Sequence, residues 1–333
     1  MKLILSTKRL FFLFLACLSS GCGASGDGNA PQARDTLVIA TVVKATGNPW
    51  FNRMEEGVED AARQLGVDAY LIGPTQFDEA QQVRMIDDLI VKGVDAICVV
   101  PNDAESVDPV LQRARQKGIL VITHESPTQK NCDYNLEAIN NQAFARYHVD
   151  KLVEYMGREG EFAMIVGSLT APTHNLWADE VEAYAQQNYP GLKLVTDRIP
   201  ANDQDVAYQR TEELIKAYPN LKGMIVFGSL GPPGAARALD EKGLADKIML
   251  VGTTMPNHGA PYLKSGTLKH ATLWDPQPVG FAMVYLAKHL LEGKPLAESL
   301  EIPGLGTVKV QDKALELDTM LKMTKDNVDQ FGF

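Results

Sequence analysis

Short apolar runs alternate with amphipathic stretches along most of the chain. Mainly aliphatic runs occupy positions 37–43, 69–73, 96–100 and 120–123, and the stretches between them place apolar residues every three or four positions. An apolar run of this length is typical of a buried strand, and the wider spacing predicts a helix with one apolar face. Strand–helix units that repeat every ~25–30 residues predict right-handed crossovers and a parallel sheet.

A second series begins near position 140. A helical pattern is followed by apolar runs that predict further strands, and a long amphipathic helix is expected near the C-terminal end. We predict an α/β fold of two doubly wound parallel-sheet domains joined by a hinge. The cleft between them should hold a ligand, because ligands of open α/β sheets bind beyond the carboxyl ends of the strands. The expected domains are residues 36–139 with 276–300, and residues 140–275 with 301–333.

Two further expectations concern details of the second series. The apolar run at 193–199 predicts a single strand, and the pattern at 322–330 predicts a short helix.

The N-terminal end has a different pattern. Basic residues precede an apolar run at 10–18, which is too short for a bilayer that needs about 20 apolar residues. Residues 1–21 therefore indicate a secretory signal peptide. The segment ends in Ser-Gly-Cys22, which resembles the lipobox of bacterial lipoproteins, so Cys22 is the expected lipidation site. Cys17 is a second candidate, and a secreted protein without lipid is the alternative. Residues 22–35 lack periodicity and indicate a flexible tether.

Composition and charge narrow the possible partners. The 333 residues are 45% hydrophobic and 22% charged, which is ordinary for a globular protein. The formal net charge of −10 becomes −13 when the three leader cations are removed, and such a surface repels nucleic-acid backbones. Cys98 and Cys132 permit a disulfide in an exported protein, with buried free thiols as the alternative. Neither lies near a His at metal-ligand spacing, so we expect no metal and no cofactor.

Candidate binding residues follow the predicted strands. The chain has three tryptophans, and all three lie in such segments. Aromatic rings cover the apolar faces of sugars, while amides, carboxylates and ammonium groups bind the hydroxyls. The pattern therefore predicts a pocket for a small sugar or polyol. Its candidate residues are Lys44, Asn48, Trp50, Phe51, Glu125, Thr173, His174, Asn175, Trp177, Trp274 and Asp275.

Several of these residues have a purely structural alternative. Phe51 suits the core face of its helix, and Lys44 and Glu125 suit solvated positions. Asp275, before a proline, suits a helix N-cap. His174 suits a solvent-facing or capping position, and at the rim of a pocket it would titrate near pH ~6–6.5.

Other function classes leave weaker signals. No nucleophile elbow, phosphate loop or dinucleotide fingerprint follows a predicted strand. Glu125 and Asp275 leave a glycosidase pair open. A sugar-responsive repressor would need an N-terminal DNA-binding helix-turn-helix, where this chain has an export signal. A protein that docks on a chemoreceptor or sensor kinase, without a role in transport, remains compatible with the pattern.

Several motifs resemble the type I solute-binding proteins of ABC importers. Asn48-Pro49-Trp50-Phe51 follows the first strand, Thr123-His124-Glu125-Ser126 the fourth, and Leu273-Trp274-Asp275 the last. The segment at 300–306 is similar to the group that binds rhamnose and autoinducer-2. The resemblance covers the chain after its leader and implies a type I periplasmic binding protein fold. It also implies a non-enzymatic, monomeric receptor in the periplasm or at the cell surface, which closes over a sugar and delivers it to an ABC permease.

The resemblance also implies roles for single positions. The family's first-loop lysine matches Lys44, and its acid after the fourth strand matches Glu125. Two backbone carbonyl contacts match Pro233 and Ala235. Autoinducer-2 receptors carry Asp-Gln where this chain has Thr173-His174, and an unpaired buried hydroxyl costs ~1–3 kcal/mol. A deoxyhexose such as rhamnose, or a pentose, is therefore the expected ligand, with autoinducer-2 as the alternative.

The lipobox-like segment generates a prediction about the anchor. Cys22→Ser should abolish labelling by a palmitate analogue and release the protein from membranes, because the thiol that accepts the lipid is gone. Cys17→Ser is the matched control and should keep its label. Labelling that persists in Cys22→Ser would assign the lipid to another residue.

Overall fold

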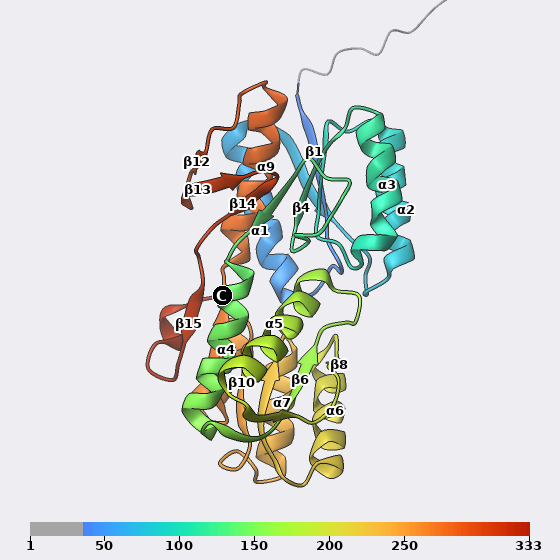
Figure 1. Ribbon diagram of the computed structural model, residues 1–333. Coiled ribbons are helices and arrows are strands. Elements are labelled where there is room, and N and C mark those ends of the chain that lie inside the picture. The colour runs from blue at the N-terminus through green and yellow to red at the C-terminus, as the bar shows by residue number, and fades with distance from the viewer. Residues whose placement is uncertain (1–35) are drawn as a thin grey trace, which may run out of the picture. The chain divides into compact units, whose positions relative to one another are not determined.

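The computed structural model describes residues 36–333, which form two α/β lobes (Figure 1). The expected signal peptide at 1–21, the lipidation site Cys22 and the tether at 22–35 lie outside the described residues. Within them, no helix combines the length and apolar character needed to cross a bilayer.

The first lobe contains a parallel sheet in the order β2-β1-β3-β4-β5. Helices α2 and α3 cover one face, and α1 and α9 cover the other. This order places a topological switch point between β1 and β3, where ligands of such sheets bind. The elements are β1 (Val38–Val42), α1 (Pro49–Leu65), β2 (Asp68–Ile72), α2 (Glu79–Lys92), β3 (Ala96–Val99), α3 (Ala104–Gln116), β4 (Leu120–His124), β5 (Tyr134–Glu137) and α9 (Pro276–Leu291).

The second lobe repeats this topology, with parallel strands in the order β7-β6-β9-β10-β11. Its switch point lies between β6 and β9. The elements are α4 (Asn141–Met156), β6 (Glu159–Val166), α5 (Pro172–Asn188), β7 (Gly191–Leu194), β8 (Ile199–Pro200), α6 (Gln204–Ala217), β9 (Leu221–Val226), α7 (Gly231–Glu241), β10 (Met249–Thr253), α8 (Pro256–Ser265) and β11 (Leu268–Leu273).

The C-terminal segment corrects the expected domain division. The sequence pattern places residues 301–333 in the second domain, but β12 (Ser299–Ile302), β13 (Gly306–Gln311) and β14 (Ala314–Glu316) extend the first sheet through the parallel pairing of β14 with β5. Only β15 (Leu321–Met323) joins the second sheet, antiparallel to β11. Figure 1 shows the first three strands beside the upper lobe and β15 beside the lower one.

Two local predictions were also wrong. The single strand expected at 193–199 is divided between β7 and β8, which both pair with β6. The helix expected at 322–330 is replaced by β15 and one 3₁₀ turn, η1 (Val328–Gln330). Pairing with β11 decides the conformation of β15, because an available sheet edge offers hydrogen bonds that outweigh a weak local helical pattern.

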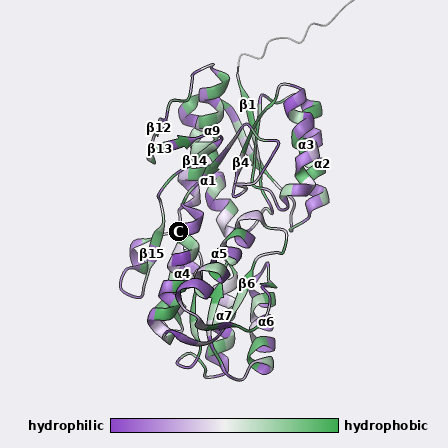
Figure 2. Ribbon diagram, in the orientation of Figure 1, coloured by the Kyte–Doolittle hydropathy of each residue, from purple (hydrophilic) through white to green (hydrophobic). Residues whose placement is uncertain are grey.

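Apolar residues gather on the strands and on the inner faces of the helices (Figure 2). Every residue of β3 is buried, as expected for a strand covered on both faces. Cys98 on β3 packs in the core beneath α9, and Cys132 packs in the core on the α2–α3 face. Both thiols are buried and free, so this pair forms no disulfide and the alternative prediction of two buried free thiols is correct.

Helices α1 and α9 approach each other closely through glycines. A Cβ atom on Gly57 would lie 1.8 Å from the backbone oxygen of Gln277, and one on Gly280 would lie 2.3 Å from the backbone oxygen of Met54. No side chain fits at either point, so glycine allows the two backbones to pack together. This contact fixes α9, whose N-terminus follows β11 of the second lobe, against the first lobe.

The glycine contact predicts a stability change. Gly57→Ala should lower the free energy of unfolding by about 2 kcal/mol, because overpacking outweighs the gain in helix propensity. The melting temperature should fall by several degrees, at roughly 2–4 °C per kcal/mol. Asn52→Ala, at an exposed position of the same helix, is the matched control and should melt near the wild type. A wild-type melting temperature in Gly57→Ala would contradict the close contact.

Candidate functional site

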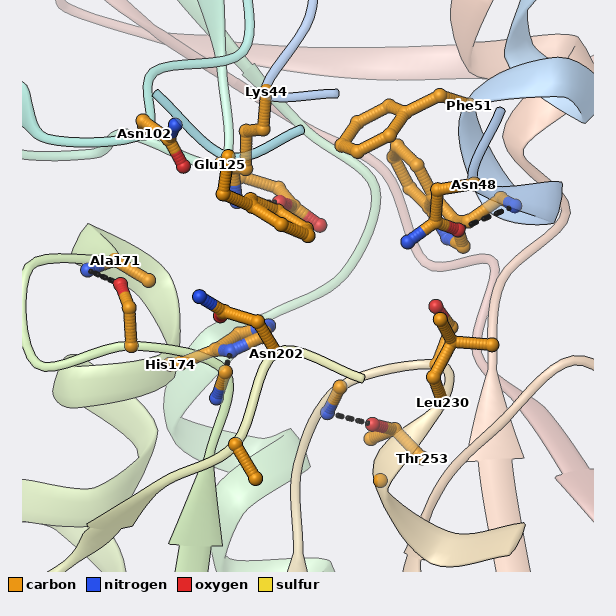
Figure 3. A pocket seen from close by; sticks show the side chains of 18 of the residues that line it. Lys44, Asn48, Phe51, Asn102, Glu125, Ala171, His174, Asn202, Leu230 and Thr253 are labelled. Atoms are coloured by element: carbon orange, nitrogen blue, oxygen red, sulfur yellow. Dashed lines mark hydrogen bonds and ion pairs between the residues drawn. The ribbon is translucent and has the colours of Figure 1, made fainter. Parts of the chain in front are cut away.

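A cleft of about 700 Å³, open to solvent, lies where the carboxyl ends of both parallel sheets face each other (Figure 3). Its residues follow the strands on both sides of each switch point. They are Lys44, Asn48, Trp50, Phe51, Phe77, Asn102, Glu125, Gly167, Ser168, Ala171, His174, Trp177, Ala201, Asn202, Gly228, Ser229, Leu230, Gly231, Thr253, Leu273 and Trp274.

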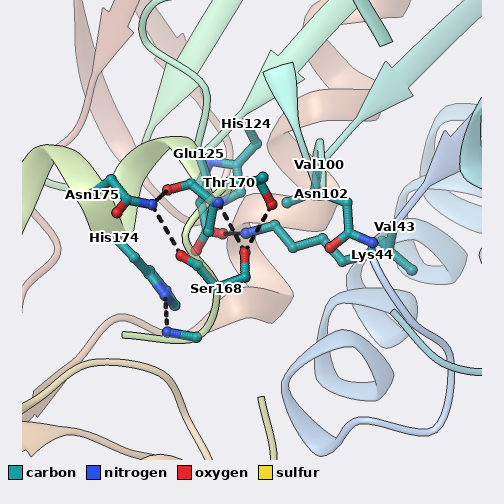
Figure 4. A network of polar contacts seen from close by, with 12 residues as sticks. Val43, Lys44, Val100, Asn102, His124, Glu125, Ser168, Thr170, His174 and Asn175 are labelled. Carbon is teal, nitrogen blue, oxygen red and sulfur yellow. Dashed lines mark hydrogen bonds and ion pairs between the residues drawn. The ribbon is translucent and has the colours of Figure 1, made fainter. Parts of the chain in front are cut away.

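An ion pair forms the first-lobe wall of the cleft. The ammonium of Lys44, which follows β1, lies 2.6 Å from a carboxylate oxygen of Glu125, which follows β4 (Figure 4). The two residues are only 5% and 6% exposed, so the alternative prediction that both lie at solvated positions is wrong. Burial alone would raise the pKa of Glu125, but the charge and hydrogen bond of Lys44, together with smaller contributions from His124 and His174, lower that pKa to about 2. The pair therefore stays ionised and contributes no net charge.

The backbone at Glu125 is unusual. Its φ angle is +54°, in the left-handed region that a residue with a side chain seldom adopts. Such conformations cost ~1–3 kcal/mol and persist where the surroundings hold them. Here the following Ser126 hydroxyl bonds to Gln129, whose amide donates to Ala104 and Asp108. The turn is thereby fixed in the shape that brings the carboxylate to Lys44.

His174 extends the site from the second lobe. Its Nδ1 accepts a hydrogen bond from the backbone N–H of Gly167 at 3.1 Å, so the neutral ring carries its proton on Nε2. The ring stacks on Trp177 with centroids 5.2 Å apart. Burial, with a smaller contribution from Lys44, lowers the pKa of His174 to about 4. The expected titration near pH 6–6.5 is therefore wrong, because the ring is half-buried against other groups and is not a solvated rim residue.

The three tryptophans belong to one aromatic cluster at the back of the cleft. Trp274 lies 6.0 Å from both Trp50 and Trp177, measured between ring centroids, with edge-to-face geometry. Trp50 also packs edge-to-face on Phe51 at 5.0 Å. The tryptophans are 1–5% exposed, so they are already buried before any ligand arrives. Phe51 packs in the core and also lines the cleft, so its predicted core position and its predicted place at the pocket are both correct.

Two buried nitrogen atoms at the cleft have no hydrogen-bond partner within residues 36–333: Asn102 Nδ2 and Trp274 Nε1. Both carry hydrogen-bond donors. The backbone N–H of Asn102 donates to Gln82, and the Gln82 amide donates to the carbonyls of Val43 and Val100. Gln82 therefore ties together the ends of β1 and β3 and holds Asn102 in place. Unpaired buried donors at a cleft are best explained by an acceptor supplied by a ligand or water.

Two predicted residues beside His174 do not line the cleft. The Asn175 amide donates to the carbonyls of Ser168 and Ala171, and its oxygen accepts from Arg198, so it shapes the loop after β6. Thr173 is buried on α5 outside the cleft lining.

Pro233 and Ala235 are buried within α7, and neither lines the cleft. Carbonyl groups within a helix accept the helix's own hydrogen bonds, so they are unsuited to the two carbonyl contacts that the resemblance implies. The segment at 228–231, immediately before and at the start of α7, lines the cleft in their place.

Asp275 turns away from the cleft. Its carboxylate receives two bonds from the Arg53 guanidinium, at 2.9 and 3.0 Å, and accepts from the backbone N–H of Gln277 at the start of α9. The alternative prediction, that Asp275 caps the N-terminus of a helix, is correct. Of the two acids considered for a glycosidase pair, only Glu125 lines the cleft, so that pair is not formed.

Sequence reasoning missed several lining residues, among them Phe77, Asn102, Asn202 and Thr253. Asn102 and Thr253 lie at or just beyond the ends of β3 and β10, and applying the strand-end rule to every strand would have found them. Asn202 follows β8, which was hidden in a longer expected strand. Phe77 lies in a loop whose pattern carries no signal. No cluster of His, Cys, Asp and Glu suited to a metal ion occurs in the described part of the chain.

Known proteins are similar to this chain in sequence and in fold. The model of a periplasmic binding protein domain matches residues 39–295. The ribose import binding protein of Bacillus subtilis (strain 168) is 22% identical over 302 residues, covering 90% of this chain and 96% of that protein. The D-allose-binding periplasmic protein of Escherichia coli (strain K12) is 24% identical over 253 residues, covering 72% of this chain and 80% of that protein.

Two solved structures of similar fold carry bound ligands. An ABC transporter solute-binding protein from Clostridium phytofermentas with bound L-rhamnose has a TM-score of 0.83 at 25% identity, covering 89% of this chain and 98% of that chain. LsrB from Clostridium saccharobutylicum in complex with AI-2 has a TM-score of 0.81 at 25% identity, covering 89% of this chain and 100% of that chain. The expected α/β architecture of two parallel-sheet domains is confirmed.

The buried ion pair predicts a coupled loss of stability. Glu125→Gln and Lys44→Met should each lower the free energy of unfolding by about 3 kcal/mol, because each leaves one buried charge alone. The double variant should lose clearly less than the sum, because no charge is then left unpaired. Urea denaturation of the four proteins at pH 7 measures this cycle.

Asp87→Asn is the matched control, because it removes the exposed ion pair with Arg113 and should cost less than about 1 kcal/mol. Strictly additive losses would show that Lys44 and Glu125 act independently.

Proposed function

Because the chain belongs to the family of periplasmic binding protein domains, we propose that its cleft binds a small neutral sugar for delivery to an ABC-type permease. The observation that carries the proposal is the buried, internally neutral Lys44–Glu125 pair in a cleft walled by aromatic rings. Each ligand property follows from one feature of that cleft.

The charge of the cleft favours a neutral ligand. The ammonium of Lys44 is already matched by Glu125, and burial keeps the nearby His174 ring neutral by lowering its pKa to about 4. An acidic sugar would bring a charge for which the described cleft residues offer no free cation. Hydroxyl groups can instead bond to both members of the pair, since the ammonium donates and the carboxylate accepts.

The shape and the remaining polar groups favour a compact, hydroxyl-rich ring. Trp50 and Phe51 offer aromatic surface from the first lobe and Trp177 from the second, which suits the C–H faces of a pyranose or furanose. Asn102 and Trp274 contribute the two buried donors without partners, and sugar oxygens are suitable acceptors. Binding would relieve an energetic penalty of these donors that is ~1–3 kcal/mol each.

Within that class, we propose a deoxyhexose such as L-rhamnose, or a pentose. Similarity to the rhamnose-bound structure supports the first choice, and similarity to ribose-binding relatives supports the second. The AI-2-bound structure keeps autoinducer-2 as the alternative ligand. The proposal includes Thr173, Asn175, Pro233, Ala235 and Asp275 only as residues that shape the site, because they lie outside the cleft lining.

The cellular setting is part of the same proposal. We propose a non-enzymatic receptor that acts as a monomer in the periplasm or at the cell surface, anchored through lipidated Cys22 and released from a signal peptide at 1–21. Its partners would be the transmembrane subunits of the permease, with a chemoreceptor or sensor kinase as a further partner. The family match supports the periplasmic binding role, and the N-terminal pattern supports the anchor.

A thermal-shift panel tests the ligand class. L-rhamnose, D-ribose, D-arabinose, D-allose and autoinducer-2 are compared with an acidic sugar, D-galacturonate. At ~100 times its Kd, the correct ligand adds ~2.7 kcal/mol to the free energy of unfolding and should raise the melting temperature by several degrees. The acidic sugar should have no effect. A shift with D-galacturonate alone, or with none of the compounds, would overturn the neutral-sugar assignment.

Variants in the same assay locate the site. Trp50→Ala should weaken binding of the active sugar by about tenfold or more, because an aromatic contact and its buried area are lost. Tyr155→Ala, on an exposed part of α4, is the control and should bind as the wild type does.

A further inference from the structure

A buried carboxylate lies beneath the cleft and lines no part of it. Glu137 ends β5, is 5% exposed, and has no Lys or Arg within ion-pair distance in the described part of the chain. Its two oxygens accept from the amides of Asn135, at 2.7 Å, and Asn141, at 3.0 Å. A buried acid that no cation pairs with is uncommon and calls for a physical explanation.

The network continues from Glu137 to the ligand cleft. Asn141 donates to Glu137 through its nitrogen, and its oxygen accepts from the indole N–H of Trp177 at 2.7 Å. Trp177 lines the cleft and carries the stacked ring of His174. One amide side chain therefore transmits the orientation set by Glu137 to an aromatic wall of the cleft.

This chain of bonds crosses between the lobes. Glu137 belongs to the first sheet, whereas Asn141 begins α4 and Trp177 lies on α5 in the second lobe. Only residues 138–140 separate β5 from α4. The segment between β14 and β15 passes alongside this connection, where the Thr319 hydroxyl donates to the carbonyl of Ala138 at 2.7 Å. The carboxylate thus lies where one lobe continues into the other.

The charged and titratable groups near Glu137 come from β4, the residue after it, and β14. At the end of β4 lies the neutral ring of His124, Glu125 follows directly after the strand, and Lys44 beyond them is already paired with Glu125. On β14, Glu316 lies opposite Glu137 in the strand register, but its carboxylate binds Asn140 at the surface. The side chains that reach Glu137 from β5 and α4 are the uncharged amides.

These surroundings set the protonation of Glu137. Burial raises its pKa to about 7, the amides of Asn135 and Asn141 oppose that rise, and the negative charge of Glu125 adds to it. By contrast, burial lowers the pKa values of His148 and His270 to about 4, so these rings do not titrate near neutrality.

We propose that Glu137 is a positioning residue for the cleft, which through Asn141 orients Trp177 and makes ligand affinity depend on whether this carboxyl is protonated. Its effect on affinity rests on the proposed sugar binding, whereas its effect on Trp177 does not. When Glu137 loses its proton, both of its oxygens accept charge-assisted hydrogen bonds. The polarised amide of Asn141 then becomes a stronger acceptor for the indole N–H, so Trp177 is held more firmly above pH 7 than below it.

The ligand-free protein provides the first test. In ¹H–¹⁵N spectra of the ¹⁵N-labelled protein, the three tryptophan indole groups give separate resonances, and Trp177→Phe identifies the one that belongs to Trp177. Between pH 5.5 and 8.5 this resonance should move with a midpoint near 7. In Glu137→Gln it should stay in place. Glu316→Gln is the matched control at the opposite strand position, and should titrate as the wild type does.

Affinity provides the second test. L-rhamnose should bind on the order of threefold more tightly at pH 8 than at pH 6, and both Glu137→Gln and Trp177→Phe should lose this difference. Trp177→Phe keeps Glu137 and an aromatic ring, so it tests the relay even if Glu137→Gln folds poorly.

The two tests separate this inference from the proposed function. A Trp177 resonance that does not titrate in the wild type, or titrates equally in Glu137→Gln, would overturn the inference whether or not a sugar binds. Absence of L-rhamnose binding at either pH, with the expected titration of the resonance, would count against rhamnose as the ligand and support the relay.

Discussion

The buried ion pair between Lys44 and Glu125 is the constraint around which the first lobe is arranged. Two charges withdrawn from water are tolerated only when they meet in good geometry, and the chain brings them together from strands β1 and β4 with β3 between them. The left-handed backbone conformation of Glu125 also helps to bring the two charges together. A neutral, hydrogen-bonding cleft wall results, and the chemistry of any ligand must match it.

The aromatic cluster plays a corresponding part between the lobes. Trp50 comes from the first lobe, Trp177 from the second, and Trp274 from the segment that joins β11 to α9. Because the rings contact one another edge to face, a displacement of either lobe changes the wall of the cleft. Recognition and the relative position of the lobes are therefore linked through the same side chains.

Two asparagines in sequence show how burial assigns different roles to identical side chains. Asn140 caps α4 and bonds to Glu316 at the surface, where water is available to both groups. Asn141 bonds to Glu137 in the interior, where its amide donates to the carboxylate and accepts from the indole of Trp177. The exposed pair adds little to stability or function, whereas the buried one connects the hinge with the cleft.

The sequence by itself determined the architecture and part of the site. Apolar periodicity placed most strands and helices, and residues after β1, β4 and β6 were correctly expected at the cleft, including Lys44, Glu125 and His174. This succeeded because strand ends and helix starts are local features. The prediction of the lipid anchor also depends on the sequence alone, since its residues lie outside those that the structure describes.

Tertiary structure decided what depends on distant partners. The sequence made Asp275 a candidate ligand contact. In the structure its carboxylate instead accepts hydrogen bonds from Arg53, which lies 222 positions away in the chain. The strands of the C-terminal tail joined the first sheet because β5 offered an open edge, and that edge has no signature in the tail's own pattern. The protonation states of Glu137 and His174 could not be predicted from the sequence either. A pKa depends on burial and on charges that only folding brings near.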